Sequence, residues 1–130
     1  MLGKYNAKDW TVVVDGSVSV TGLGEDMVSG AKDEELYSIS TGGQGDVVIS
    51  EINDPIGTVT ITVQATCPQR KYLVDWAKKG DTRSIWCENK GLDTRFGGSL
   101  ARPKNLPEVA AGAEAEDWEM EIGVFDYTMD

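Results

Sequence analysis

The strict alternation of apolar and polar residues between Thr58 and Thr66 constrains the fold of this chain most strongly. In the run TVTITVQAT every second residue is apolar, and the residues between are Thr or Gln. Because the side chains of a β-strand point alternately to opposite faces, this pattern predicts a strand with one buried face and one wet face. The segment from Trp118 to Val124 repeats the pattern. The apolar residues of both segments are predicted core residues: Val59, Ile61, Val63, Trp118, Met120, Ile122 and Val124.

Other segments also carry strand signals. In the run WTVVVDGSVSV, which starts at Trp10, Asp15 and Gly16 separate two β-branched stretches. Asp-Gly favours the positive φ angles of a two-residue type I′ turn, so we expect a hairpin here. Further short strands are expected at residues 46–52, 84–89 and 94–102.

One amphipathic helix is expected over residues 67–79. Thr66 and Gln69 fit a capping box at its start, and Gly80 fits its C-terminal cap. Two side chains of its apolar face are predicted core residues: Leu73 and Trp76. The chain is therefore predicted to be a mostly antiparallel β protein with one covering helix, in a single domain spanning residues 1–130.

The absence of histidine removes several kinds of chemistry. None of the 130 residues is His, so neither a Ser-His-Asp or Cys-His arrangement nor a His-ligated zinc site is possible. The two cysteines, Cys67 and Cys87, cannot supply a four-sulfur site, and we expect packed thiols rather than a disulfide. Carboxylates are abundant, but neither an EF-hand spacing nor a marked acid–base pair is present. We expect no enzymatic activity, no metal and no cofactor.

Acidic residues outnumber basic ones by 22 to 12, which gives a formal net charge of −10. A nucleic-acid clamp needs clustered Lys and Arg, so this balance argues against one. The net charge is −7 over residues 1–66, +5 over residues 67–104 and −8 over residues 105–130. Segments of opposite charge can form complementary surfaces that meet in a partner or in another copy of the chain. The alternative is a dipolar, solvated surface with no partner. Neither a membrane helix nor an apolar signal core is present, so a soluble protein of the cytoplasm is the default expectation, with no membrane contact.

The segment of residues 21–46 has the least regular pattern. It holds six glycines and two acidic clusters, with weak strand-like pieces at residues 27–29 and 36–39. We expect a long extended loop with Asp33, Glu34 and Glu35 at its tip. Such a loop is either a functional excursion or a mobile surface segment.

Four segments in a fixed order resemble one known family. They are YNAKDWTVVVDG, GLGEDMVSGAKDEE, GQGDVVISEINDPIGTVTITVQAT and EDWEMEIGVFDY. In this order and spacing the chain resembles the tail tube proteins of tailed bacteriophages, from about Tyr5 to Tyr127.

This resemblance implies two packed antiparallel sheets, as a β-sandwich or barrel, with one flanking α-helix and a long extended loop. It also implies hexameric rings that stack into a hollow tube, through which DNA passes without specific binding during ejection. The residues expected to line the lumen are Thr58, Thr60, Thr62, Gln64, Glu119 and Glu121. The residues expected to contact other subunits are Glu25, Asp26, Met27, Val28, Lys32, Asp33, Glu34, Glu35, Leu36 and Tyr37.

The resemblance further implies a place in the virion tail, after assembly in the host cytoplasm. The implied partners are baseplate and tail-terminator proteins, a tape measure protein in the lumen, and a sheath if the tail contracts. Two alternatives remain open: the inner tube of a contractile secretion or bacteriocin apparatus, and an unrelated β-sandwich module that binds a ligand such as carbohydrate. The four Trp residues fall mostly on apolar faces, which favours core packing over a binding platform.

Overall fold

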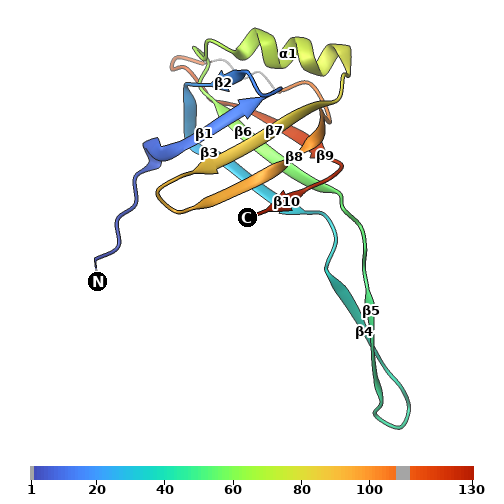
Figure 1. The fold of residues 1–130 in the computed structure, drawn as a ribbon. Coiled ribbons are helices and arrows are strands. Elements are labelled where there is room, and N and C mark those ends of the chain that lie inside the picture. Colours follow the sequence, from blue (N-terminus) through green and yellow to red (C-terminus); the bar gives the residue numbers. More distant parts are fainter. Residues whose placement is uncertain (1, 108–111) are drawn as a thin grey trace.

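Strands dominate the computed structural model, which describes residues 2–107 and 112–130 (Figure 1). The strands are β1 (Trp10–Val14), β2 (Val18–Val20), β3 (Leu23–Lys32), β4 (Tyr37–Thr41), β5 (Val47–Glu51), β6 (Gly57–Val63), β7 (Arg83–Asn89), β8 (Thr94–Pro103), β9 (Trp118–Val124) and β10 (Thr128–Met129). The helices are a 3-10 turn, η1 (Ala7–Asp9), and one α-helix, α1 (Arg70–Lys79). The predicted mostly β class with one flanking helix is confirmed.

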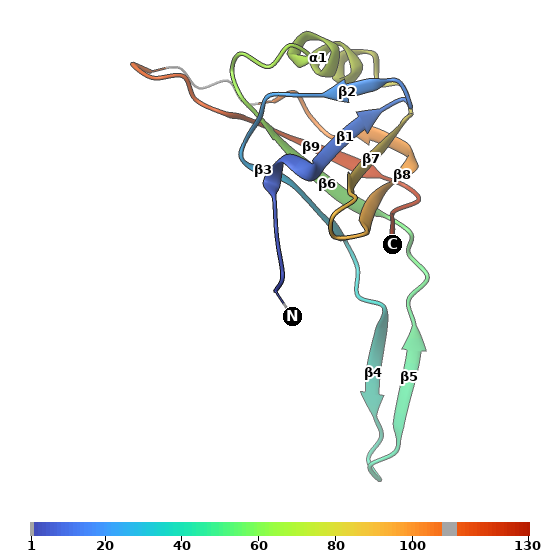
Figure 2. The same ribbon diagram turned by 60° about the vertical axis from the view of Figure 1, so that its left-hand side comes forward.

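The main sheet is one continuous antiparallel sheet that bends into a nearly closed barrel. Its strand order is β2-β1-β7-β8-β9-β6-β3, and β10 also pairs with β8. Most of β8 pairs with β7, whereas its last three residues, from Ala101 to Pro103, pair with β9. Strand β8 therefore links the half of the barrel that contains β1 and β7 to the half that contains β9 and β6 (Figure 2). In the barrel, one bent sheet is present in place of the two separate sheets that were expected.

A close backbone approach fixes the β7–β8 contact. Gly97 has a φ of 138°, and a Cβ there would lie 2.1 Å from the Ile85 carbonyl oxygen. Only glycine fits this position. The β7–β8 register shifts between Arg83 and Ile85, so β8 carries a bulge next to this glycine.

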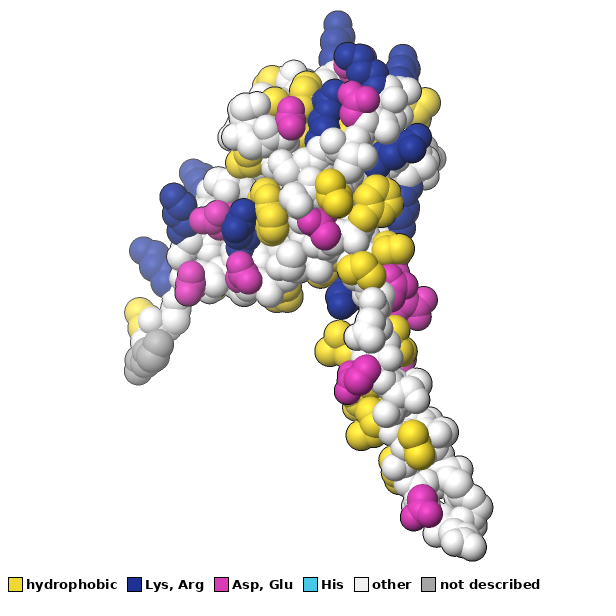
Figure 3. Space-filling model, turned by 45° about the vertical axis from the view of Figure 1, so that its right-hand side comes forward, with side chains coloured by type: hydrophobic (Ala, Val, Ile, Leu, Met, Phe, Trp, Pro, Cys, Tyr) yellow, Lys and Arg dark blue, Asp and Glu magenta, His cyan; other side chains and the backbone are white. Residues whose placement is uncertain are grey.

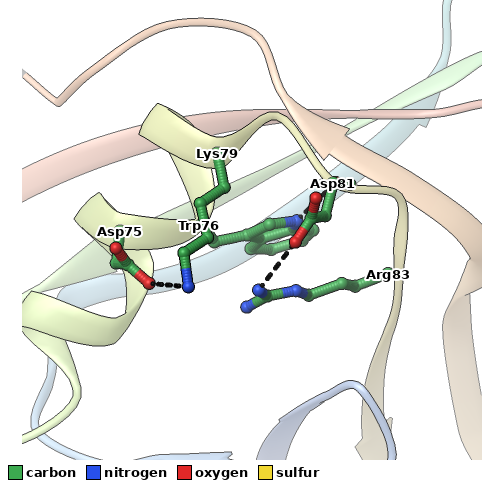
Figure 4. Close-up of polar contacts among 5 residues, drawn as sticks. All are labelled: Asp75, Trp76, Lys79, Asp81 and Arg83. Atoms are coloured by element: carbon green, nitrogen blue, oxygen red, sulfur yellow. Dashed lines mark hydrogen bonds and ion pairs between the residues drawn. The ribbon is translucent and has the colours of Figure 1, made fainter.

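A single hydrophobic core fills the barrel, and α1 covers one end of it (Figure 1). Of the nine predicted core residues, Trp118 is half-buried and the other eight are buried. Trp76 of α1 is fully buried, and its indole Nε1 donates a 2.8 Å hydrogen bond to the Asp81 carbonyl oxygen. Figure 4 shows the Arg83 guanidinium beside this indole, within 3.2 Å of the Asp81 carboxylate.

The start of α1 differs from the prediction and its end agrees with it. The helix begins at Arg70, three residues after the predicted Cys67, and Gln69 makes no side-chain cap bond. Instead, the Gln69 Oε1 accepts hydrogen bonds from the backbone N–H and the hydroxyl of Thr21, which lies in the link between β2 and β3. Gly80 ends the helix in the left-handed conformation, as predicted.

The β1–β2 hairpin has positive φ at both Asp15 and Gly16, as predicted. Val14 pairs with Val18, so the loop has one residue more than the expected two. The thiols of Cys67 and Cys87 are free and buried, as expected. Burial raises the pKa of Cys87 to about 12.

The 21–46 segment does not form one loop. Its first half is β3, an edge strand that pairs with β6 and carries an irregularity between Leu23 and Val28. The chain then leaves the body as a β4–β5 hairpin, here called the arm (residues 33–56), which projects away from the barrel (Figures 1 and 2). The predicted tip, Asp33 to Glu35, lies at the root of the arm, and the turn at residues 42–45 forms the tip. The weak pattern of residues 36–39 is therefore that of a ribbon with no core behind it.

Candidate assembly surfaces

The outer face of β6 and β9 collects most of the residues predicted to line a lumen. Thr60 pairs with Glu121, and Thr62 pairs with Glu119, so these four side chains lie side by side opposite the core. The threonines are half-buried and the glutamates are exposed. Gln64 lies just beyond the end of β6 and is exposed. The surface is thus a band of hydroxyls bordered by carboxylates.

Lys104, which is not among the residues predicted for this face, also reaches it. Its Nζ donates a 2.7 Å hydrogen bond to the Thr58 hydroxyl, which in turn donates a 2.8 Å hydrogen bond to the Asp33 carboxylate. No sequence pattern indicated this, because Lys104 reaches the face through the pairing of the end of β8 with β9. Arg102 is exposed on the same face, since it pairs with Gly123, which pairs with Thr58. The end of the face at the root of the arm therefore carries cations.

The arm exposes large apolar side chains, four of them on one face and Val48 on the other. The register of its two strands places Tyr37, Ile39, Val47 and Ile49 on the first face, together with Thr41 and Glu51. The four apolar side chains are between 49% and 60% exposed. Figure 3 shows hydrophobic side chains along the arm and on the adjoining part of the body. A two-stranded ribbon is marginally stable alone in water, so this face needs a partner surface.

The arm is also strongly acidic. It contains six Asp and Glu residues and no Lys or Arg: Asp33, Glu34, Glu35, Asp46, Glu51 and Asp54. Within the part of the chain that the structure describes, no basic side chain forms an ion pair with these carboxylates. A partner surface with basic residues around an apolar centre matches both properties.

A second apolar area adjoins the root of the arm. Ile56, Leu100, Phe125 and Met129 are between 38% and 67% exposed. The Phe125 N–H donates to the Leu100 carbonyl oxygen, and the Tyr127 N–H donates to Pro55, so this area is tied to the arm root. The arm and the lower body thus form one adjoining set of exposed apolar side chains.

Asp126 holds this lower region together. Its carboxylate accepts hydrogen bonds from the Ser99 N–H, the Ser99 hydroxyl and the Leu100 N–H at 2.5–3.1 Å. Partial burial opposes ionisation, but the hydrogen bonds outweigh it and lower the pKa of Asp126 below its ordinary value.

The outer face of α1 carries a shallow hollow of about 670 Å³ at the opposite end of the molecule from the arm. Its lining includes the apolar side chains of Val74 and Trp118. Its charged lining residues are Arg70, Lys71, Asp75 and Lys78. The Arg70 guanidinium lies 4.9 Å from the Trp118 ring centroid and donates to the Ala65 carbonyl oxygen.

The residues predicted to contact other subunits occupy two elements. Met27 and Val28 are half-buried in β3, and Lys32 ends that strand. The five residues 33–37 lie exposed at the root and start of the arm. Glu25 and Asp26 belong to the irregular part of β3, and their side chains lie outside what the structure describes.

In residues 2–107 and 112–130, no group of three or more His, Cys, Asp or Glu side chains is placed to hold a metal ion. The same residues include no helix long and apolar enough to cross a membrane.

No protein-family model and no curated protein sequence matches this chain. Solved structures do match its fold. A chain in the tube-terminating cap of the anti-feeding prophage has a TM-score of 0.69 and 13% identity, and the match covers 100% of this chain and 94% of that one. A chain in the extended sheath-tube complex of PVC, an extracellular contractile injection system, has a TM-score of 0.69 and 15% identity, with 98% and 91% covered.

A chain in the extended PVC sheath/tube terminator has a TM-score of 0.65 and 16% identity, with 98% and 96% covered. This chain therefore has a barrel fold found in assemblies of contractile injection systems, over almost its whole length.

Proposed function

We propose that this protein is a structural subunit of a tail-like particle, in which hexameric rings of this chain stack into a hollow tube. The arm is the observation that carries the proposal. It exposes large apolar side chains, among them Tyr37, Ile39 and Ile49, and carries six carboxylates on a ribbon with no core of its own. Such a segment is stable when it is buried against another molecule.

The shape of the subunit supports a repeating assembly. From Asp33 to the tip the arm has about 12 residues, which span ~40 Å at the rise of a β-strand. A projection of that length reaches well onto a neighbouring copy. Because the arm and the body differ, the contact is heterologous, and heterologous contacts close into rings or continue as filaments.

The band of Thr and Glu side chains on β6 and β9 is the proposed lumen wall. DNA carries about one negative charge per 1.7 Å of axis, so a wall of Lys and Arg would bind it. Hydroxyls and carboxylates wet or repel it instead. Lys104 and Arg102 lie at the Thr58 end of this band, whereas Glu119 pairs with Thr62 at its other end.

The proposed partners follow from the same assembly. The similar folds occur in sheath-tube and tube-terminator complexes of contractile particles, which supports a contractile apparatus with a sheath around the tube. Baseplate, terminator and tape measure proteins are the other proposed partners. The role is structural, with no catalytic step. In a phage tail the channel passes DNA, and in a related injection apparatus it carries other cargo.

A tube-terminating cap is the second candidate. One of the similar chains comes from a tube-terminating cap and another from a sheath/tube terminator. A cap subunit closes a ring but does not continue the stack.

Negative-stain electron microscopy of the purified protein tests both candidates. A tube subunit is expected to give uniform hollow rings that elongate into tubes as its concentration rises. A cap subunit gives single rings at every concentration. A protein that stays monomeric at high concentration would rule out both assemblies.

A further inference from the structure

The hollow on α1 and the arm are chemically complementary, and this pairing goes a step beyond the proposed function, on which it rests. The hollow is lined by two apolar side chains, by three basic ones and by one carboxylate that pairs with Lys79: Val74, Trp118, Arg70, Lys71, Lys78 and Asp75. The arm has an apolar face bordered by carboxylates. We propose that the α1 hollow of one copy receives the arm of a second copy.

Charge is the first argument. The segment Arg70–Lys79 carries four basic residues and one acidic residue, Asp75, which pairs with Lys79 at 3.1 Å. Lys71 and Lys78 are exposed on the face that bears the hollow. The arm has the opposite charge throughout. Opposite potentials on two surfaces guide their association and suppress wrong pairings.

The second argument is the matching order of apolar and charged groups. On the arm, Ile39 and Ile49 face the same side, and Glu51 follows two residues after Ile49 on that side. In the hollow, the two apolar side chains likewise share one surface with basic side chains. An arm seated there buries apolar groups on both surfaces and brings carboxylates to lysines at the rim, where the pairs give specificity.

The third argument is placement. The α1 helix and the arm lie at opposite ends of the molecule in both ribbon views (Figures 1 and 2). An arm therefore cannot reach the hollow of its own copy. It can reach that of another copy, which gives a polar, head-to-tail array with a basic end and an acidic end.

Cysteine cross-linking tests the contact directly. The double variant Ile39→Cys/Val74→Cys places one thiol on the apolar face of the arm and one in the hollow, and the native Cys67 and Cys87 are buried. Assembled protein treated with a mild oxidant is expected to give a ladder of disulfide-linked oligomers on a non-reducing gel. The matched control, Ser38→Cys/Val74→Cys, places the first thiol on the opposite face of the arm and is expected to give no ladder.

Charge reversal tests the same contact without cross-linking. The variant Lys71→Glu/Lys78→Glu is expected to lower the yield of tubes at least tenfold, and adding Glu35→Lys/Glu51→Lys in the same chain is expected to restore it. The control variant Lys8→Glu/Lys90→Glu, with both changes outside the hollow, is expected to form tubes normally.

The outcomes separate this inference from the proposed function. If tubes form but neither the ladder nor the charge effect is seen, the inference is overturned while the tube function stands. If the unmodified protein forms no rings or tubes, both are overturned.

Discussion

The hydroxyl of Thr58 in β6 donates a 2.8 Å hydrogen bond to the carboxylate of Asp33, at the point where β3 ends and the arm begins. Lys104 donates to the same hydroxyl from the end of β8. Three strands are therefore joined at the arm root by one side-chain oxygen. This contact couples the direction of the arm to the polar face of the barrel.

Replacing Thr58 with Val removes both hydrogen bonds while nearly keeping the shape of the side chain. Because the site is only half-buried, the free energy of unfolding is expected to fall by about 1 kcal/mol. The Asp33 amide, which donates to the Ile56 carbonyl oxygen, should exchange its proton faster. Urea unfolding and hydrogen exchange measure the two effects. Thr11→Val, on β1, is the control and should leave exchange at Asp33 unchanged; equal exchange in both variants would contradict the coupling.

Removing the arm should separate folding from assembly. We expect a variant in which Asn-Gly replaces residues 37–51 to remain folded, because the arm contributes nothing to the buried core. The variant should be monomeric by analytical ultracentrifugation and form no tubes by electron microscopy. Ordinary tubes from this variant would show that the arm does not link subunits.

Reversing the charge of the proposed lumen wall should affect DNA passage rather than assembly. In virions, Glu119→Lys/Glu121→Lys is expected to leave tube length normal and to slow DNA release at least tenfold, since the added cations bind passing phosphates. Glu114→Lys/Glu116→Lys changes two exposed carboxylates that precede β9 and serves as the control. Unchanged release by the first variant would place Glu119 and Glu121 outside the channel.

Asp126 should make the stability of the lower body depend on pH. Its pKa is lower in the folded protein than in the unfolded chain, because Ser99 and Leu100 donate hydrogen bonds to the carboxylate. The unfolded state therefore binds more protons in acid, so this contribution is present above the unfolded pKa of about 3.9 and is lost as pH falls through the folded pKa.

Thermal unfolding between about pH 3 and pH 7 measures this effect. Asp126→Asn is expected to reduce stability near neutral pH and to flatten the acid side of the profile. The control is Asp93→Asn, at an exposed carboxylate in the turn between β7 and β8. A profile of Asp126→Asn parallel to that of the unmodified protein would contradict the assignment.

Much of the barrel could be predicted because strand faces are a local property. The alternation in residues 58–63 and 118–124 predicted which side chains point inward. This prediction does not depend on which strands are the neighbours, because side chains alternate along every strand. Gly80 likewise predicted the end of α1 from its own conformational freedom. The predicted start of α1 was wrong because the Gln69 side chain binds Thr21 and not the first turn of the helix. Thr21 is 48 positions away in the sequence, so no local pattern indicates this contact.

The arm shows where local patterns stop being informative. The apolar side chains on one face of the arm are all exposed: Tyr37, Ile39, Val47 and Ile49. Because they pack on no core, their sequence pattern is weak and resembles that of an irregular loop. The pairing of β4 with β5 and the position of the tip depend on which other strands form the main sheet. Lys104 is a similar case, because its place on the polar face follows from the β8–β9 pairing.

The amino-acid sequence by itself determined the mostly β class, the inward faces of β6 and β9, the single helix and the acidic charge. These properties depend on the period of neighbouring residues and on composition. Only the tertiary structure decided that β6 pairs with β9, that the arm leaves the body as a ribbon, and that it lies opposite α1. The physical reason is that pairing between distant strands depends on how the whole core packs, which no single segment encodes.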